Sequence, residues 1–147
     1  MFRKIVIVLV VSFGLIQFLN PKLENPKVDK SLTLEASSDV MGVLKRSCYD
    51  CHSFETKFSE YAKVAPFSFV VMSHIKDGRK ALNFSKWKTI DKEIKIARLK
   101  RLIVTTHNHM MPLPSYLFAH KDASLSKKDI ELLSSWAEVE LKKLNKE

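Results

Sequence analysis

The sequence predicts an all-α protein in which one apolar helix at the amino terminus precedes a small helical domain. Only three glycines occur among 147 residues, and lysine-rich stretches with apolar residues at intervals of three and four recur along the chain. That spacing is the period of an amphipathic helix, and no segment shows the alternation typical of a strand. The length suits one domain with a small core rather than two domains.

The amino terminus predicts insertion into a membrane. Arg3 and Lys4 precede an apolar run from Ile5 to Leu19, which is the order of a basic region and a hydrophobic region in an export signal. Because no A-x-A-like cleavage site follows, we expect residues 1–20 to remain as an anchor in the bacterial inner membrane. Basic residues stay inside, so the domain would face the periplasm. A cleaved, soluble periplasmic form is the alternative.

Residues 21–38 have the composition of an extended linker. They contain Pro21 and Pro26, several charged residues and no apolar periodicity. We expect this segment to hold the domain, residues 39–147, away from the membrane surface.

The first helix of the domain is expected to begin near Ser38 or Asp39, either of which can cap it. It leads into Cys48-Tyr49-Asp50-Cys51-His52, and the pattern C-x-x-C-H is the attachment signature of a c-type haem. Two cysteines on one turn can form thioethers with the two vinyl groups of a porphyrin. The adjacent His52 can then be the proximal iron ligand. We therefore predict one covalent haem c per chain, held by Cys48 and Cys51.

The pattern has three alternatives: a thioredoxin-like redox pair, half of a zinc site, and chance. A redox pair would need a βαβ pattern around it, and a zinc site would need further ligands. The sequence offers no such strands and no second cysteine pair. With both cysteines bound to haem, no disulfide can form.

Two more helices are predicted before the next informative stretch. Pro66 suits the first position of one, and Gly78 lies at or near its end. Its apolar face carries a histidine, His74, that could reach the iron but could equally be a hydrogen-bonded core residue. Ser85 can cap a short turn that contains Trp87, and the following helix is expected over residues 91–106.

A methionine on a proline-rich loop is the predicted distal ligand. Met111 directly precedes Pro112 in the stretch 107–114, where proline stiffens the backbone, and a weakly binding thioether needs such positioning. Methionine and histidine ligation raises the reduction potential and suits electron transfer. The alternatives for the distal position are Met110, His107, His109 and His74, and methionine is also common core filler.

The last helix and the pocket wall complete the expected fold. Ser126 begins that helix, and Asp129 three residues later predicts a capping box. We expect the apolar wall of the haem pocket to be formed by Leu102, Ile103, Trp136, Phe54 and Tyr61. The net charge is +9, and because basic residues are spread over several helices, a solvated surface is a better interpretation than a nucleic-acid site.

Several segments together resemble one family. They are Cys48 to Ser53, Ala65-Pro66, His74 with Gly78-Arg79, Leu82 to Trp87, Met111 to Tyr116, His120 and Leu125-Ser126. On these residues the chain resembles the small c-type haem-binding domain family of exported bacterial proteins, from about Pro21 to Trp136. The resemblance implies a cytochrome c-like fold, an exported and often membrane-anchored haem protein, Cys48, Cys51 and His52 as haem-binding residues, and Met111 in the methionine-proline position. Phe58-Ser59-Glu60 and Lys121 depart from the tryptophans and the proline that such proteins often have at these places.

We therefore expect a monohaem cytochrome c that passes single electrons between redox partner proteins at the inner membrane and transforms no substrate itself. The alternative is a haem sensor or small-ligand binder with an open or labile distal position, with weak peroxidase activity as a further property. A non-haem metal protein or a nucleic-acid binder ranks last, because neither suits an export signal.

Overall fold

The computed structural model describes residues 1–146 and is all-helical. Helices make up 71% of the chain, and residues 1–146 contain no strand, so the predicted fold class is confirmed. Short 3₁₀ helices are labelled η. The elements in order are α1 (Phe2–Ile16), η1 (Gln17–Leu19), η2 (Lys30–Leu32), α2 (Ser38–Ser47), α3 (Tyr49–His52), η3 (Glu60–Lys63), α4 (Phe67–Ala81), η4 (Phe84–Thr89), α5 (Lys92–His107), α6 (Pro114–Ala119), η5 (Lys121–Ala123) and α7 (Lys127–Leu144).

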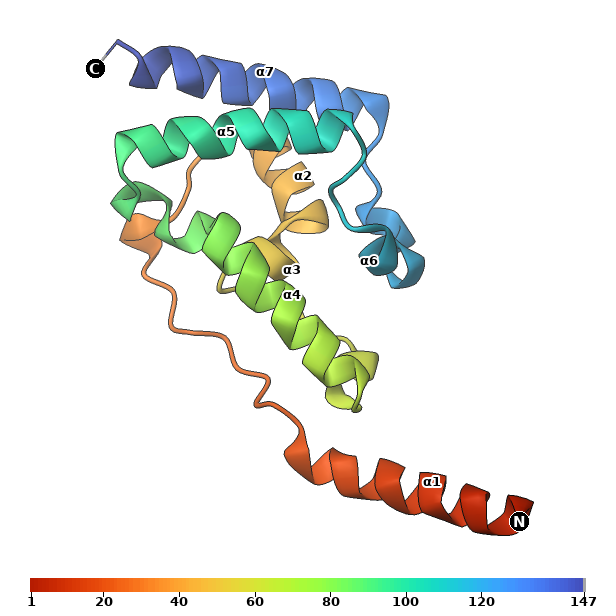
Figure 1. Cartoon of the computed structure of the whole chain (residues 1–147). Coiled ribbons are helices and arrows are strands. Elements are labelled where there is room, and N and C mark those ends of the chain that lie inside the picture. The colour runs from red at the N-terminus through yellow and green to blue at the C-terminus, as the bar shows by residue number, and fades with distance from the viewer. Residues whose placement is uncertain (147) are drawn as a thin grey trace.

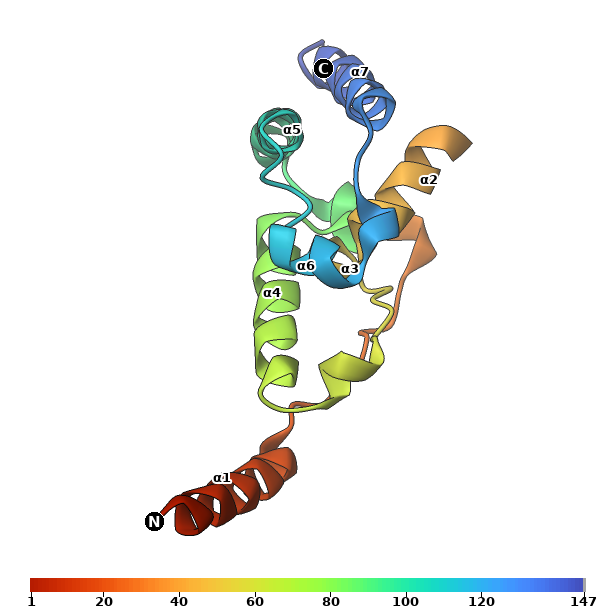
Figure 2. The ribbon, with the colours of Figure 1, turned by 90° about the vertical axis from the view of Figure 1, so that its right-hand side faces the viewer.

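The amino-terminal helix projects away from the rest of the molecule (Figures 1 and 2). The stretch Phe2–Leu19 has a mean hydropathy of 2.1 over 18 residues, and none of it is buried. By length and composition it could be a membrane anchor or a signal sequence.

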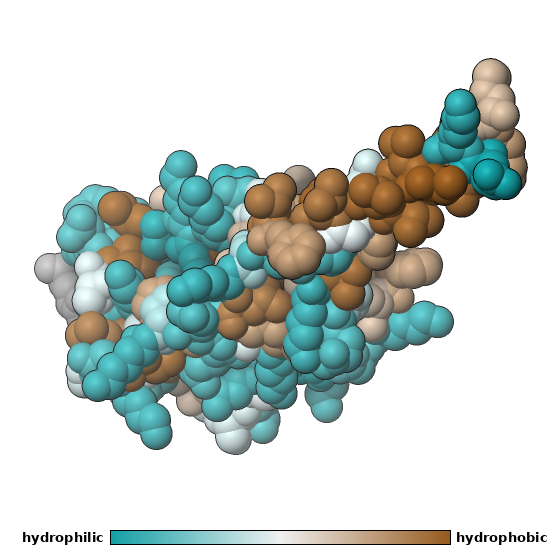
Figure 3. Space-filling model, turned by 90° about the horizontal axis from the view of Figure 1, so that it is seen from below, coloured by the Kyte–Doolittle hydropathy of each residue, from teal (hydrophilic) through white to brown (hydrophobic). Residues whose placement is uncertain are grey.

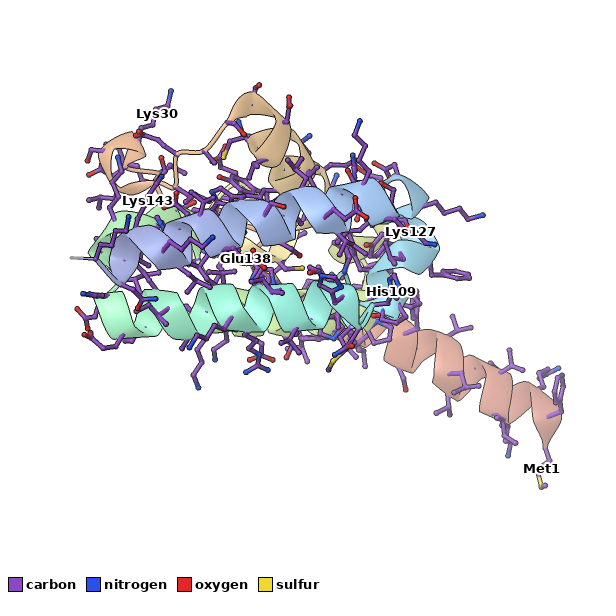
Figure 4. All side chains as sticks on the ribbon, turned by 90° about the horizontal axis from the view of Figure 1, so that it is seen from above. Met1, Lys30, His109, Lys127, Glu138 and Lys143 are labelled. Atoms are coloured by element: carbon purple, nitrogen blue, oxygen red, sulfur yellow. The ribbon has the colours of Figure 1, made fainter. Side chains whose placement is uncertain are left out.

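The hydrophobic core lies at the opposite end of the molecule, where α5 and α7 pack side by side over α2 (Figures 1 and 4). Leu44, Leu99 and Leu133 are almost completely buried there, together with Phe84 from η4. These residues come from four separate elements, so the core joins both halves of the domain. The predicted helix over residues 91–106 corresponds closely to α5.

One of the three helix caps predicted from the sequence is confirmed, and the other two differ. The predicted capping box of α7 is confirmed: Ser126 Oγ accepts from the Asp129 N–H (3.1 Å), and Asp129 Oδ2 accepts from the Ser126 N–H (2.9 Å). Helix α2 has Ser37 at its N-cap, without a side-chain hydrogen bond. Asn83 rather than Ser85 caps η4, because the Ser85 hydroxyl accepts a hydrogen bond from the Phe54 N–H instead (2.9 Å).

The segment between α1 and α2 lies along the domain rather than standing free of it. Asn25 donates to the Thr56 carbonyl (2.8 Å) and accepts from the Arg79 guanidinium (2.8 Å). The Leu34 N–H donates to the Phe84 carbonyl (2.8 Å), and its side chain is buried in the core. The segment is mostly irregular, and these contacts give it a fixed course.

Helices α3 and α4 touch backbone to backbone at Gly78. A Cβ placed on Gly78 would lie 2.5 Å from the carbonyl oxygen of Cys51 and 3.0 Å from its Cβ. Gly78 belongs to the last turn of α4, so its role is this close approach and not the end of the helix. The neighbouring Arg79 donates to the Ser53 carbonyl (2.7 Å) and thereby holds the chain that leaves α3.

We expect Gly78→Ala to lower the free energy of unfolding by about 1–3 kcal/mol, the usual cost of forcing a methyl group into a packed contact. Gly42→Ala is the matched control, because Gly42 lies inside α2 and a Cβ placed on it would meet nothing within 4 Å. That change should raise the free energy of unfolding by roughly 0.5–1 kcal/mol, since alanine loses less backbone entropy. Urea unfolding of the full chain in detergent, followed by circular dichroism, measures both. Equal effects of the two substitutions would contradict the close contact.

Candidate functional site

A pocket of about 600 Å³ lies between α3, α4 and the segment from Met111 to His120. The volume is within the range of cofactor and small-molecule sites, about 300–1,000 Å³. Most of its lining surface is apolar, although polar and charged residues, among them Asp50, Lys57, Asp77 and Arg101, also contribute to it. Cys48, Cys51, His52 and Met111, the four residues that the sequence predicts as cofactor ligands, all line it.

The short helix α3 presents the two cysteines and the histidine on one turn. Cys48 precedes the helix, and its carbonyl accepts from the backbone N–H groups of Cys51 (3.2 Å) and His52 (2.9 Å). Burial raises the pKa of the Cys48 thiol to about 12 and that of Cys51 to about 11. Both sulfur atoms are therefore thiols at neutral pH, on the wall of the same pocket.

The His52 imidazole is oriented by a backbone carbonyl. Its Nδ1 lies 3.0 Å from the carbonyl oxygen of Leu82, and because a carbonyl can only accept, Nδ1 carries the proton. The ring also meets Phe84 edge-on, with 6.3 Å between ring centroids. Burial lowers the pKa of His52, which favours the neutral ring. In that tautomer Nε2 has a free lone pair and can bind a metal ion.

One face of α4 forms an apolar wall of the pocket. The sequence places Phe67, Val70, Val71 and Ile75 at intervals of three and four, and all four line the pocket, as does His74. Ile75 is buried, whereas Phe67 and Val70 are exposed toward the rim. His74 therefore remains a possible ligand by position.

The loop that carries Met111 is tied to the end of α5. The Thr105 carbonyl accepts from the N–H groups of both Met110 (2.9 Å) and Met111 (3.2 Å). His109 adopts a left-handed conformation with φ of 52°, which ends the helix before Pro112 is reached. Met111 is 36% exposed and lines the pocket, whereas Met110, His107 and His109 are exposed and do not line it. The structure thus brings one of the two neighbouring methionines to the site.

The segment 111–120, which we call the strap, forms one side of the pocket. Helix α6 places Tyr116 so that its hydroxyl donates to Asp50 Oδ2 (2.7 Å), and Asp50 lies between the two cysteines. His120 stacks on the Tyr116 ring, with centroids 4.4 Å apart, and lies 2.9 Å from the Tyr61 hydroxyl. Burial and the bond to Asp50 raise the pKa of Tyr116, so the phenol stays protonated and can donate.

The sequence did not predict this strap. The one sequence feature that could have indicated it is the spacing of four residues between Tyr116 and His120, which puts both rings on one face of a helical turn. That spacing alone does not reveal Asp50 as a partner, because the two residues are 66 positions apart.

The predicted apolar wall is wrong for four of its five residues. Leu102, Ile103 and Trp136 pack in the core between α5 and α7. The Phe54 ring lies under the Arg79 guanidinium, with 5.3 Å between the ring centroid and the guanidinium carbon. Only Tyr61 of that set lines the pocket. The remaining wall comes from α4, Ala62, Phe58 and Leu113. Within residues 1–146, no three histidine, cysteine, aspartate or glutamate side chains are grouped closely enough to hold a metal ion by themselves.

A helical domain with one apolar pocket, a neutral imidazole and a thioether on its lining has the features of a cofactor-binding protein. The family model described as a haem-binding domain matches residues 11–139, which is most of the chain. The chain therefore belongs to this haem-binding family. Neither a curated protein nor a solved structure matches it.

The residues present fit haem. Nε2 of His52 is the free nitrogen of a ring held by Leu82, and such a fixed imidazole suits an axial iron ligand. The pocket around it is apolar and of cofactor size, as a porphyrin ring requires.

We expect Tyr116 and Asp50 to stabilise each other by about 1.5 kcal/mol, the low end for a hydrogen bond to a charged group, because both are only partly buried. The measurement is a double-mutant cycle of Tyr116→Phe and Asp50→Ala on the free energy of unfolding. The control cycle pairs Asp50→Ala with Tyr61→Phe, which removes the hydroxyl facing His120 instead. A coupling energy as large in the control cycle would contradict a specific strap.

Proposed function

We propose that this protein is an exported, membrane-anchored cytochrome with a single covalent haem c, and that it passes single electrons between redox partner proteins without transforming a substrate. The observation that carries the proposal is that Cys48, Cys51, His52 and Met111 line one pocket. The last of these lies 59 residues after His52 in the sequence, so the fold is what gathers them.

Cys48 and Cys51 are the proposed attachment points. Cys48 is the N-cap of α3 and Cys51 lies within that helix, so the two are three residues apart on one turn; both line the pocket and remain thiols. This pairing in C-x-x-C-H order suits addition to the two vinyl groups on one edge of haem. Gly78 supports that function because it lets α4 approach the Cys51 backbone without obstruction.

His52 and Met111 are the proposed axial ligands. The Leu82 carbonyl holds the imidazole with Nε2 free, and the Thr105 carbonyl holds the loop that ends in Met111. Haem iron with histidine and methionine ligands supplies a one-electron couple of raised potential. The chain holds both residues at the pocket, where His52 is half-buried and Met111 is 36% exposed.

Two cations and two phenols border the same pocket. Lys57 and Arg101 line it, and their positive charges can pair with the carboxylates of a bound porphyrin. Tyr61 and Tyr116 have partners of their own in His120 and Asp50, so their rings can exclude water while their hydroxyls stay hydrogen-bonded.

The first experiment tests covalent attachment. The full chain, expressed with a cytochrome c maturation system, should retain haem after denaturing electrophoresis and after extraction with acidified acetone, because thioether bonds survive both. The double variant Cys48→Ala, Cys51→Ala should lose all haem to the extract. Free haem in the extract from the unchanged chain would mean that haem is bound without covalent bonds, and the c-type assignment would be wrong.

The second experiment tests the distal ligand. We expect Met111→Ala to abolish the weak far-red sulfur-to-iron band of the ferric spectrum, to lower the reduction potential and to let carbon monoxide bind the ferrous form, because the iron loses its thioether. Met110→Ala is the matched control, since Met110 is exposed outside the pocket, and it should leave all three unchanged. Ready carbon monoxide binding by the unchanged chain would instead favour a haem sensor or small-ligand binder.

A further inference from the structure

The end of the apolar helix is joined to the domain by a set of hydrogen bonds. Gln17 Nε2 donates to the Ala65 carbonyl (3.1 Å), and the Ala65 N–H donates to Gln17 Oε1 (3.0 Å). Asn20 Nδ2 donates to the Lys63 carbonyl (3.2 Å), and the Ser68 hydroxyl donates to Asn20 Oδ1 (2.6 Å). Ala65 and Ser68 are fully buried. We call the hydrogen bonds of Gln17 and Asn20 to residues 63–68 the clamp.

The clamp sits at the level where a membrane span must end. The 18 residues Phe2–Leu19 rise about 27 Å at 1.5 Å per residue, and a bilayer core is about 30 Å thick. The whole stretch is therefore needed to cross, which places Gln17 and Asn20 at the boundary between hydrocarbon and headgroups. The domain residues bonded to them must lie at the same level.

Exposed apolar side chains gather beside the clamp. Phe18 is 88% exposed and Leu19 69%, and next to them on the domain are Val64 (40%), Phe67 (59%) and Phe69 (39%). Figure 3 shows hydrophobic residues on the face of the domain that adjoins the end of α1. Figures 1 and 2 show that α1 leaves the domain beside the amino end of α4. Exposed apolar side chains gathered in one place are a feature of interaction surfaces.

We propose that the domain itself rests on the lipid bilayer, with residues 63–69 in the interface and the clamp fixing its orientation. Lipid is the occupant because the patch continues from the membrane span at the depth of the headgroups. Apolar side chains of interfacial segments sink about 5–10 Å into this region. Lys22, which follows the span and is exposed, lies where it can meet anionic headgroups. The anchor is thus a rigid support for the domain and not a flexible tether.

Photo-crosslinking of the full chain in vesicles of phosphatidylethanolamine and phosphatidylglycerol tests this contact. A photoreactive residue is introduced as Phe69→p-benzoylphenylalanine, and its adducts are identified by mass spectrometry. The control is Val139→p-benzoylphenylalanine, an exposed apolar position on α7, which lies on the opposite side of the domain from α1 (Figure 1). We expect lipid adducts at position 69 and several-fold fewer at position 139.

A second variant separates the clamp from the patch. Gln17→Ala with Asn20→Ala removes the side-chain bonds of the clamp while α1 stays in the bilayer, so lipid adducts at position 69 should fall several-fold. Asn25→Ala is its control, because it breaks bonds to Thr56 and Arg79 further along the linker, and it should leave those adducts unchanged.

Three outcomes overturn the proposal: equal lipid adducts at positions 69 and 139, adducts at position 69 to another protein instead of lipid, or a chain whose mass shows that residues 1–20 have been removed. The absorption spectrum of the same sample reports haem separately. Failure of the membrane contact can therefore be distinguished from failure of the proposed cytochrome function.

Discussion

The contact between Gly78 and Cys51 is the constraint on which the rest of the site depends. Because a single side-chain carbon at Gly78 would meet the Cys51 carbonyl at 2.5 Å, only glycine lets α4 lie directly against α3. That approach brings the residue after α4 close enough for the Leu82 carbonyl to accept a hydrogen bond from His52 Nδ1–H. It also places the apolar face of α4 beside the two cysteines. One missing methyl group thus sets the position of the cysteines, the imidazole and the pocket wall together.

The core and the pocket are built from largely separate sets of residues. Leu99, Leu102 and Leu133 join α5, α7 and α2, whereas the pocket is lined by α4 and by the segment after Met111. Cys48 connects the two regions, because it packs against the core and also lines the pocket. The Tyr116 bond to Asp50 lies within the pocket lining, and the Arg46 ion pair with Asp129 (2.9 Å) joins α2 to α7. A helical core can therefore hold the frame of the site while the strap at the side of the pocket is secured by single polar contacts of about 0.5–1.5 kcal/mol each.

The proposed membrane contact and the pocket meet on α4. Phe67 belongs to the exposed patch beside the clamp and also lines the pocket, and Val71 and Ile75 continue the same face inward. Under the proposed membrane contact, the rim of the pocket at the amino end of α4 would face the bilayer surface. Electron exchange under the proposed function would then take place close to the membrane, in an orientation that all copies of the protein share.

The local features of this protein were determined by the sequence alone: the helical class, the course of α5, the capping box at Ser126 and the C-x-x-C-H turn. Each depends on residues a few positions apart, for which periodicity and hydrogen-bonding groups suffice. Only the tertiary structure showed which methionine reaches the pocket, and that Asp50 pairs with Tyr116. It also showed that Leu102 and Trp136, which the sequence predicted for the pocket wall, lie in the core. Those outcomes join segments tens of residues apart. Their physical cause is how closely helices can pack, and no short pattern records that.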